Sequence, residues 1–252
     1  MNDQFAFCKV AHVPVRIDTK DASEMVTQLL FGEVVELLSY SNQWIHIRSY
    51  MDGYEGWVDS KQLQKLSFKE VTRWLDGIHI EHSFSRTVLG PEGEFKIFKG
   101  SFRPVNNSKN FNIGKCNYVF LDDEDAKPLS YIEFAKSFLN TPYLWGGKSA
   151  LGIDCSGFVQ TVLRYFDIKF PRDASQQIDF GQEYDFHEKQ PGDLVFFISE
   201  NNKIHHVGIV CSENEIIHAH GYVRIDTLTQ EGIVRKIDGV LSHKIAQINR
   251  VF

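Results

Sequence analysis

The pattern of apolar residues changes once along this 252-residue chain, near residue 131. Before that point, short β-like runs such as HVPVRI and EVVELLSY alternate with turn signals such as SNQ and MDGYEG. After it, YIEFAKSFLN and then GFVQTVLRYF place apolar residues at helical spacing, and β-like runs follow them. Closely spaced short strands are typical of small barrels, and helices followed by an antiparallel sheet are typical of the α+β class. We therefore expect a multidomain protein.

Four segments are predicted from this pattern. Residues 1–66 are expected to form a small β-barrel, and residues 67–122, which begin with a short possible helix, a second one. Residues 123–130 are charged, contain a proline and read as a linker, and Ser130 is suited to cap the next helix. Residues 131–252 are expected to form an α+β domain.

Composition narrows the classes of ligand. The net charge of −6 disfavours nucleic acid, which needs a basic face. The stretch MNDQFAFCKVAHVPVR lacks the features of a secretory signal, and no apolar run approaches the length of a membrane span. The four cysteines show neither zinc nor redox-motif spacing. We expect reduced thiols, a cytoplasmic monomer, and no metal, cofactor, nucleic acid or membrane partner.

Cys155 is the candidate nucleophile. It lies in DCSGFV, where a loop passes into a predicted helix. Backbone N–H groups and the positive end of the helix dipole favour a thiolate there, and a nearby histidine adds to this effect. Such a thiolate can attack a carbonyl group. The remaining cysteines are expected to be buried apolar residues; they are Cys8, Cys116 and Cys211.

Two histidines downstream are candidates for the base and for a third polar group. His206 lies in HHVGIV and His218 in IIHAH, in two strands expected to turn at SENE. In such a hairpin, positions summing to about 427 face each other, so His218 would pair near residue 209. Along an irregular hairpin the two rings can share one face of the sheet. The other histidines considered are expected to be surface or structural residues; they are His187, His205 and His220.

The motifs PYLWGG, DCSGFV, PGDLVFF and HHVGIV with IIHA, in that order, resemble the NlpC/P60 family of papain-like cysteine peptidases. The resemblance covers residues 131 to about 250. It implies Cys155 as nucleophile, His206 as base and His218 as third residue. It also implies that Tyr143 helps to form the oxyanion site.

The first half resembles bacterial SH3 domains, most clearly in GYEGWV, so both predicted barrels are expected to be SH3-like. Two such domains before NlpC/P60 resemble γ-D-glutamyl-L-diamino-acid endopeptidases of peptidoglycan recycling. That resemblance implies a stem-peptide substrate whose L-Ala bears a free amine. A buried ammonium must be paired, so a carboxylate there would reject acetylated peptides. The expected amine contacts are Glu24, Tyr54 and Asp154, with Glu55 in reserve.

The α-carboxylate of D-Glu needs donors, and Ser156, Arg172 and Ser175 have the right chemistry. Trp145 is expected to wall the groove. Several of these residues could instead have a purely structural role. Exposed acids on barrel loops are common, and Asp154 would also suit a helix cap. Arg172 would also suit a surface pair with Asp173 or Asp179, and Trp145 a place in the core.

Three functions remain open on the sequence. The first is a cysteine endopeptidase that cuts between γ-D-Glu and the diamino acid, either lysine or diaminopimelate. The second is a cell-wall-binding SH3 protein with an inactive peptidase domain. The third keeps the thiol chemistry but acts on another muropeptide bond, as an amidase or transferase.

Overall fold

The computed structural model describes residues 4–106, 108–123 and 128–252. The chain divides into two compact units. The first contains Met1–Lys127 and Lys148–Ala150, and the second contains Pro128–Gly147 and Leu151–Phe252. Of the predicted linker, residues 124–127 lie outside the described residues. No helix in the described part of the chain is long and apolar enough to cross a membrane.

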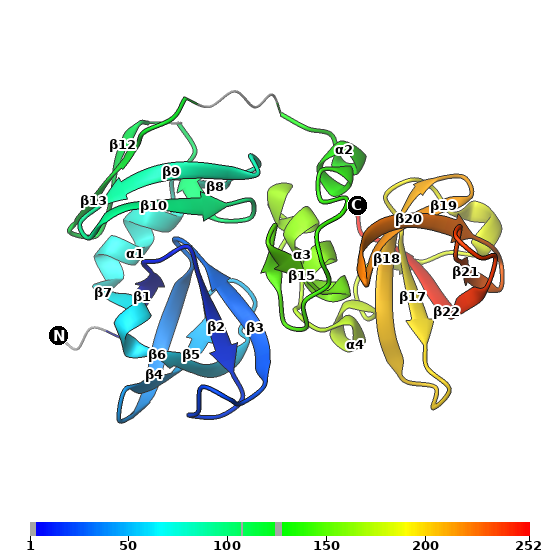
Figure 1. The fold of residues 1–252 in the computed structure, drawn as a ribbon, viewed down its shortest axis with the longest axis horizontal. Coiled ribbons are helices and arrows are strands. Elements are labelled where there is room, and N and C mark those ends of the chain that lie inside the picture. Colours follow the sequence, from blue (N-terminus) through cyan, green and yellow to red (C-terminus); the bar gives the residue numbers. More distant parts are fainter. Residues whose placement is uncertain (1–3, 107, 124–127) are drawn as a thin grey trace. The chain divides into compact units, whose positions relative to one another are not determined.

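The first unit begins with a seven-stranded antiparallel sheet in the order β3-β2-β6-β5-β4-β1-β7 (Figure 1). In β2, Val13 and Val15 are buried and their neighbours are less so, because alternate side chains point to opposite faces. The buried faces of these strands share one apolar cluster. The elements are β1 (Phe5–Cys8), β2 (His12–Arg16), β3 (Met25–Leu30), β4 (Val34–Ser41), β5 (Trp44–Ser49), β6 (Glu55–Asp59), η1 (Ser60–Gln62) and β7 (Leu63–Leu66).

The predicted helix after this sheet is α1 (Phe68–Leu75), which begins with a capping box between Ser67 and Glu70. Its Trp74 is buried, and the indole nitrogen donates to the Gly32 carbonyl at 2.8 Å. A four-stranded sheet in the order β10-β9-β13-β12 and a pair β11-β8 follow. These strands are β8 (Ile78–Ile80), β9 (Ser85–Gly90), β10 (Gly93–Phe98), β11 (Phe102–Pro104), β12 (Asn110–Ile113) and β13 (Cys116–Phe120). That residues 67–122 form a second SH3-like barrel stays a prediction.

The first unit also contains β14 (Lys148–Ser149). Lys148 Nζ lies 3.0 Å from one Glu33 carboxylate oxygen and 3.1 Å from the other, and both side chains are buried. The Lys148 backbone N–H donates to the Gln28 side chain at 2.9 Å. A buried charge needs this kind of pairing, because its desolvation is costly.

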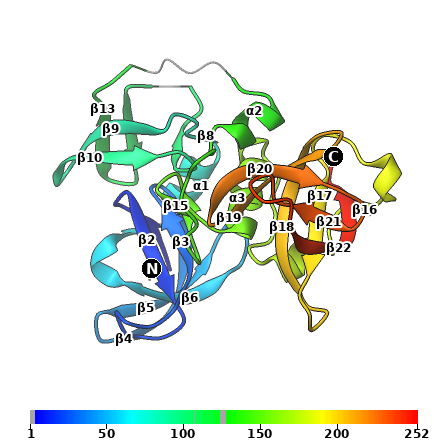
Figure 2. The same cartoon turned by 45° about the vertical axis from the view of Figure 1, so that its right-hand side comes forward.

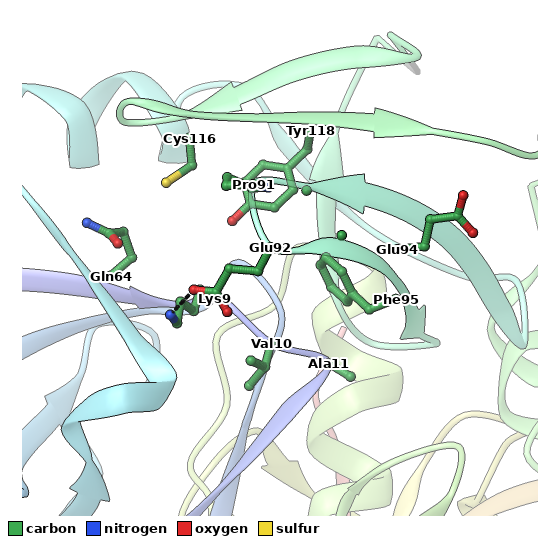
Figure 3. Close-up of a pocket in the computed structure, with 12 residues that line it drawn as sticks. Lys9, Val10, Ala11, Gln64, Pro91, Glu92, Glu94, Phe95, Cys116 and Tyr118 are labelled. Atoms are coloured by element: carbon green, nitrogen blue, oxygen red, sulfur yellow. Dashed lines mark hydrogen bonds and ion pairs between the residues drawn. The ribbon is translucent and has the colours of Figure 1, made fainter.

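A cavity of about 400 Å³ opens in the same unit (Figure 3). The rings of Phe95 and Tyr118 lie in its wall, and an ion pair between Lys9 and Glu92 lies at its edge. Of the residues predicted to act in catalysis or substrate binding, none lines this cavity.

The second unit begins with α2 (Tyr131–Lys136), which is capped by Ser130 as predicted and carries a capping box with Glu133. Its sheet has the order β16-β22-β17-β18-β19-β20-β21, and β21 pairs back onto β22, so six strands close into a barrel. The remaining elements are β15 (Gly152–Ile153), α3 (Cys155–Tyr165), α4 (Ala174–Gln177), β16 (Gln182–Glu183), η2 (Phe186–Glu188), β17 (Leu194–Ile198), β18 (Ile204–Ser212), β19 (Glu215–His220), β20 (Tyr222–Leu228), β21 (Gly232–Val234) and β22 (Leu241–Arg250).

Helix α3 is the helix predicted to follow Cys155, and every one of its residues is buried. It packs against β18 and β19, and in both views α2 and α3 lie on the same side of strands β17 and β18 (Figures 1 and 2). A helix that is covered on all sides is held rigidly by its neighbours. Its first residue is therefore well placed to carry a fixed side chain.

Candidate active site

Cys155 is the first residue of α3, and Asp154 caps the helix by accepting a hydrogen bond from the Gly157 N–H at 2.7 Å. The N–H groups of Val207 and Ser156 reach the Cys155 sulfur and favour its negative form. Val207 follows His206 in β18, so this contact brings the thiol to the strand that carries the predicted base.

The expected low pKa of this thiol is wrong for the resting protein. Burial is the main reason why the pKa of Cys155 is raised to about 12; the nearby Asp154 carboxylate adds to this rise, while the two N–H groups and Arg172 oppose it. Desolvation penalises the charged form, and here it outweighs the helix terminus. Sequence reasoning placed the cysteine correctly on its helix but had no signal for its burial. The resting side chain is therefore a neutral thiol.

The two predicted histidines meet on one face of the sheet. His206 Nε2 lies 2.9 Å from His218 Nδ1, and both rings are buried. Near the turn, Ser212 faces Glu215, which is the predicted sum of 427. A bulge between Val210 and Ser212 then changes the sum to 426 and sets Gly208 opposite His218.

The bulge decides which side chains face each other. Because His206 lies two residues from Gly208, it shares the face of His218. A Cβ atom on Gly208 would come within 2.9 Å of the His218 Cβ, so a glycine is needed at that position. The predicted pairing near residue 209 is thus corrected by one residue.

His218 is also hydrogen-bonded to a buried acid, Asp226, which the sequence analysis did not identify. His218 Nε2 lies 3.1 Å from Asp226 Oδ2 on β20, and Arg224 Nε donates to the same oxygen at 2.8 Å. The tight turn at Gly221 pairs His218 with Arg224. In a hairpin, residues that face each other have a constant sum of residue numbers. Applied to β19 and β20 as it was to β18 and β19, this rule would have placed Arg224 and Asp226 near His218.

Burial would raise the pKa of Asp226, but hydrogen bonds from His218 and the Lys236 amide, with the charge of Arg224, hold it well below its usual value. Asp226 is therefore an ionised carboxylate. Burial lowers the pKa of His206 well below 6.5 and lowers that of His218 as well. Both imidazoles are neutral at neutral pH.

A further buried ring, His243 on β22, was also missed. It stacks on His206 with ring centroids 4.3 Å apart, and burial lowers its pKa to about 3. His205 and His187 are exposed, and His220 is half-buried with Arg224 close to its ring. In the described ranges, no group of three or more histidine, cysteine or acidic side chains is arranged to hold a metal ion.

Tyr143 is half-buried, and its backbone forms a bridge with Ile153, two residues before the nucleophile. Burial raises its pKa, and the negative charges that Cys155 and Asp154 would carry raise it further. The phenol therefore keeps its proton and can donate a hydrogen bond near the thiol.

Comparisons with known proteins decide the family. Residues 140–242 match the NlpC/P60 family, and residues 15–63 match the bacterial dipeptidyl-peptidase SH3 domain. Over 221 residues the chain is 31% identical to the gamma-D-glutamyl-L-lysine dipeptidyl-peptidase of Bacillus subtilis (strain 168), covering 77% of this chain and 71% of that protein. The chain belongs to the NlpC/P60 family. It is therefore a cysteine peptidase with an SH3-like domain.

Other similarities agree with this NlpC/P60 assignment. The dipeptidyl-peptidase 6 of Lysinibacillus sphaericus is 35% identical over 227 residues, which are 78% of this chain and 80% of that one. The crystal structure of an NlpC/P60 family protein from Bacillus cereus ATCC 10987 matches with a TM-score of 0.78 and 20% identity, covering 98% of this chain and 99% of the other. At 20% identity, the similarity to the Bacillus cereus structure shows a shared fold.

The NlpC/P60 domain gathers three of the predicted substrate contacts beside Cys155. Arg172 donates to Asp154 through both terminal nitrogens, at 2.6 and 3.0 Å, and to the Ser156 hydroxyl at 2.9 Å. Asp154 also accepts from the Gly146 N–H at 2.8 Å. The alternative of an exposed Arg172 pair is wrong, because Arg172 is 2% exposed and held by Asp154. The capping alternative for Asp154 is confirmed.

The remaining predicted contacts are spread over both units. Ser175 is exposed on α4, and Trp145 is 62% exposed, so the alternative that Trp145 belongs to the core is wrong. In the first unit, Glu24 is exposed and Tyr54 is half-buried. Glu55, the reserve residue, is exposed and forms an ion pair with Arg48 at 2.8 Å. Their substrate roles stay predictions.

Proposed function

We propose that this peptidase hydrolyses the bond between γ-D-Glu and the diamino acid of peptidoglycan stem peptides that bear a free N-terminal L-Ala. The observation that carries the proposal is the placement of Cys155 at the start of α3, next to the strand of the hydrogen-bonded pair His206 and His218. The relatives in Bacillus subtilis and Bacillus cereus, both named gamma-D-glutamyl-L-lysine dipeptidyl-peptidase, support the choice of bond.

In the proposed mechanism the resting thiol and His206 are both neutral. As the Cys155 sulfur attacks the carbonyl carbon, the S–C bond forms and the thiol proton moves to His206 Nδ1. This is the ring nitrogen of His206 that is not hydrogen-bonded to His218. His206 then gives this proton to the leaving amine as the C–N bond breaks. Water then attacks the thioester carbon while His206 takes a water proton, and as the C–S bond breaks His206 gives this proton to the Cys155 sulfur, which restores the thiol.

Charge that develops on the carbonyl oxygen needs donors. We assign this role to the protonated phenol of Tyr143, which lies near enough for the Cys155 charge to raise its pKa. A preorganised donor of this kind is typically worth about 10²–10³ in kcat, because it stabilises charge that appears only in the transition state.

Substrate recognition is assigned to the residues around this centre. The D-Glu carboxylate is proposed to bind Ser156, Ser175 and Arg172, with the exposed indole of Trp145 as a wall. The ammonium of L-Ala is proposed to bind carboxylates and a phenol. The candidates are Glu24, Tyr54 and Asp154. We further propose that residues 67–122 form a second SH3-like barrel and that the catalytic domain is papain-like.

Product analysis tests this function. The purified protein is incubated with L-Ala-γ-D-Glu-L-Lys, its diaminopimelate counterpart, and N-acetylated forms of both. We expect release of L-Ala-γ-D-Glu from the free-amine peptides, loss of cleavage on acetylation, and no product with Cys155→Ala. Equal cleavage of acetylated peptides would refute the amine contacts, and an active Cys155→Ala variant would refute the mechanism.

Two alternatives give different results. A wall-binding protein would sediment with intact peptidoglycan and release no peptide. An amidase or transferase would leave other products in a mixed muropeptide pool analysed by mass spectrometry. A cytoplasmic role in recycling is part of the proposal, supported by the need for a free amine, which an earlier cleavage must expose. Fractionation of cells that express the native gene tests this location.

A further inference from the structure

Asp226 ends the chain of hydrogen-bonded side chains that begins at His206. It is 3% exposed, and its Oδ2 lies 3.1 Å from His218 Nε2 and 2.8 Å from Arg224 Nε. Its Oδ1 accepts from the Lys236 backbone N–H at 2.9 Å. Both carboxylate oxygens therefore face donors.

We propose that Asp226 is a positioning residue that fixes the tautomers of His218 and His206 and so makes His206 Nδ1 the basic nitrogen of the site. The inference rests on the proposed function, in which His206 takes the thiol proton of Cys155. Asp226 acts through the two rings and touches neither the thiol nor the proposed substrate.

The first step concerns His218. An ionised carboxylate is only an acceptor, so the hydrogen between Asp226 and His218 must be on His218 Nε2. A neutral imidazole carries one N–H, and burial keeps His218 neutral. His218 Nδ1 is therefore a bare acceptor.

The second step transfers this constraint to His206. His206 Nε2 lies 2.9 Å from the bare His218 Nδ1, so His206 must supply the hydrogen. His206 is also neutral, which leaves its Nδ1 without a proton. The charge of one buried acid thus determines which nitrogen of a ring two links away can act as a base.

The same arrangement supports the charged state that follows proton transfer. Once His206 holds the thiol proton, it donates through Nε2 to His218, which donates to the carboxylate. In a low-dielectric interior this anion offsets the new positive charge even through an intervening ring.

Asp226→Asn is the informative substitution, because it keeps the shape and changes one acceptor into a donor. The rigid Lys236 amide requires the amide oxygen at the Oδ1 position. The NH₂ group then faces His218 Nε2, while the half-buried Arg224 side chain can turn away. His218 must then carry its hydrogen on Nδ1, which turns His206 into the Nδ1–H form.

A matched control is Asp193→Asn. Asp193 is 1% exposed in the same unit and accepts from Arg250 Nε at 2.7 Å and from the Gln190 N–H at 2.7 Å. It therefore resembles Asp226 in burial and in its arginine partner, and none of these hydrogen bonds involves a histidine. Any general cost of losing a buried carboxylate should appear in both variants.

The test is ¹⁵N NMR of histidine-labelled full-length protein at neutral pH, without substrate. We expect protonated Nε2 and bare Nδ1 for His206 and His218 in the unmodified protein and in Asp193→Asn, and inverted tautomers in Asp226→Asn. Protonated Nδ1 on His206 in the unmodified protein overturns the proposal even if the variant does not fold, and so do unchanged tautomers in a folded Asp226→Asn.

Kinetics provide a second readout. We expect kcat of Asp226→Asn to fall at least about 100-fold with KM nearly unchanged, as for an inverted catalytic tautomer, and Asp193→Asn to stay within about threefold. An equal fall in both variants contradicts a role in tautomer choice. A failure of the proposed substrate is distinguishable, because the NMR readout needs no substrate.

Discussion

Two buried cysteines, one in each unit, have the same kind of desolvation but different neighbours. Cys8 lies on β1 with its sulfur 3.2 Å from the Val10 carbonyl and 3.8 Å from the Leu29 carbonyl, and a backbone hydrogen bond from Val10 lowers the pKa of this thiol. Cys155 has the N–H groups of Val207 and Ser156 at its sulfur. Burial raises the pKa of both thiols.

Each thiol has one buried ion pair beside it, Glu33 with Lys148 near Cys8 and Asp154 with Arg172 near Cys155. The Val207 N–H at the Cys155 sulfur directly follows His206 in β18, and hydrogen bonds lead from His206 through His218 to the ionised Asp226. Burial alone does not mark a reactive cysteine. What distinguishes Cys155 in the proposed mechanism is a histidine that can accept its proton.

The largest difference between the two thiols should appear in catalysis. Cys155→Ala is expected to lower kcat/KM by about 10⁴-fold or more, because no nucleophile remains. Cys8→Ala is expected to leave kcat/KM within about threefold and to lower the free energy of unfolding by about 1–2 kcal/mol, through the small cavity it creates. Steady-state kinetics and urea unfolding of both variants check this. Similar values of kcat/KM in Cys155→Ala and Cys8→Ala would contradict the assignment of Cys155 as the nucleophile.

The buried ion pair near Cys8 should affect the free energy of unfolding more than an exposed ion pair does. Glu33→Ala removes one partner of a buried ion pair, and we expect a loss of about 3–5 kcal/mol in the free energy of unfolding. Lys61→Ala, which removes an exposed partner of Asp59, should cost at most about 1 kcal/mol. Equal losses in the two variants would show that Glu33 and Lys148 are not a buried structural pair.

A smaller effect is expected on the pH dependence of the peptidase. Burial lowers the pKa of His206 well below 6.5, so this base stays unprotonated as the pH falls from 7 to 6. We predict that kcat/KM changes by less than about twofold over this interval, whereas an unshifted histidine would lose most of its basic form. A fall of kcat/KM that follows a titration near pH 6.5 would contradict a neutral, desolvated His206.

Much of the fold followed from local patterns, because caps, turns and periodicity act over a few residues. The Ser130 cap and the helix that begins at Cys155 are examples. The bulge in β18 was not visible in the pattern, and it changes the register by one residue. The pairing of Arg172 with Asp154 and the burial of Cys155 depend on segments distant in sequence, so spacing arguments could not reach them.

The central claim is that Cys155 rests as a neutral thiol and loses its proton to His206 only during attack. The direct test is the rate of Cys155 carboxamidomethylation by iodoacetamide, followed by peptide mass spectrometry from pH 5 to 10. With the pKa of Cys155 raised to about 12, we predict a rate that rises about tenfold per pH unit without a plateau. A high, constant rate from about pH 6 upward would reveal a preformed thiolate and contradict the account.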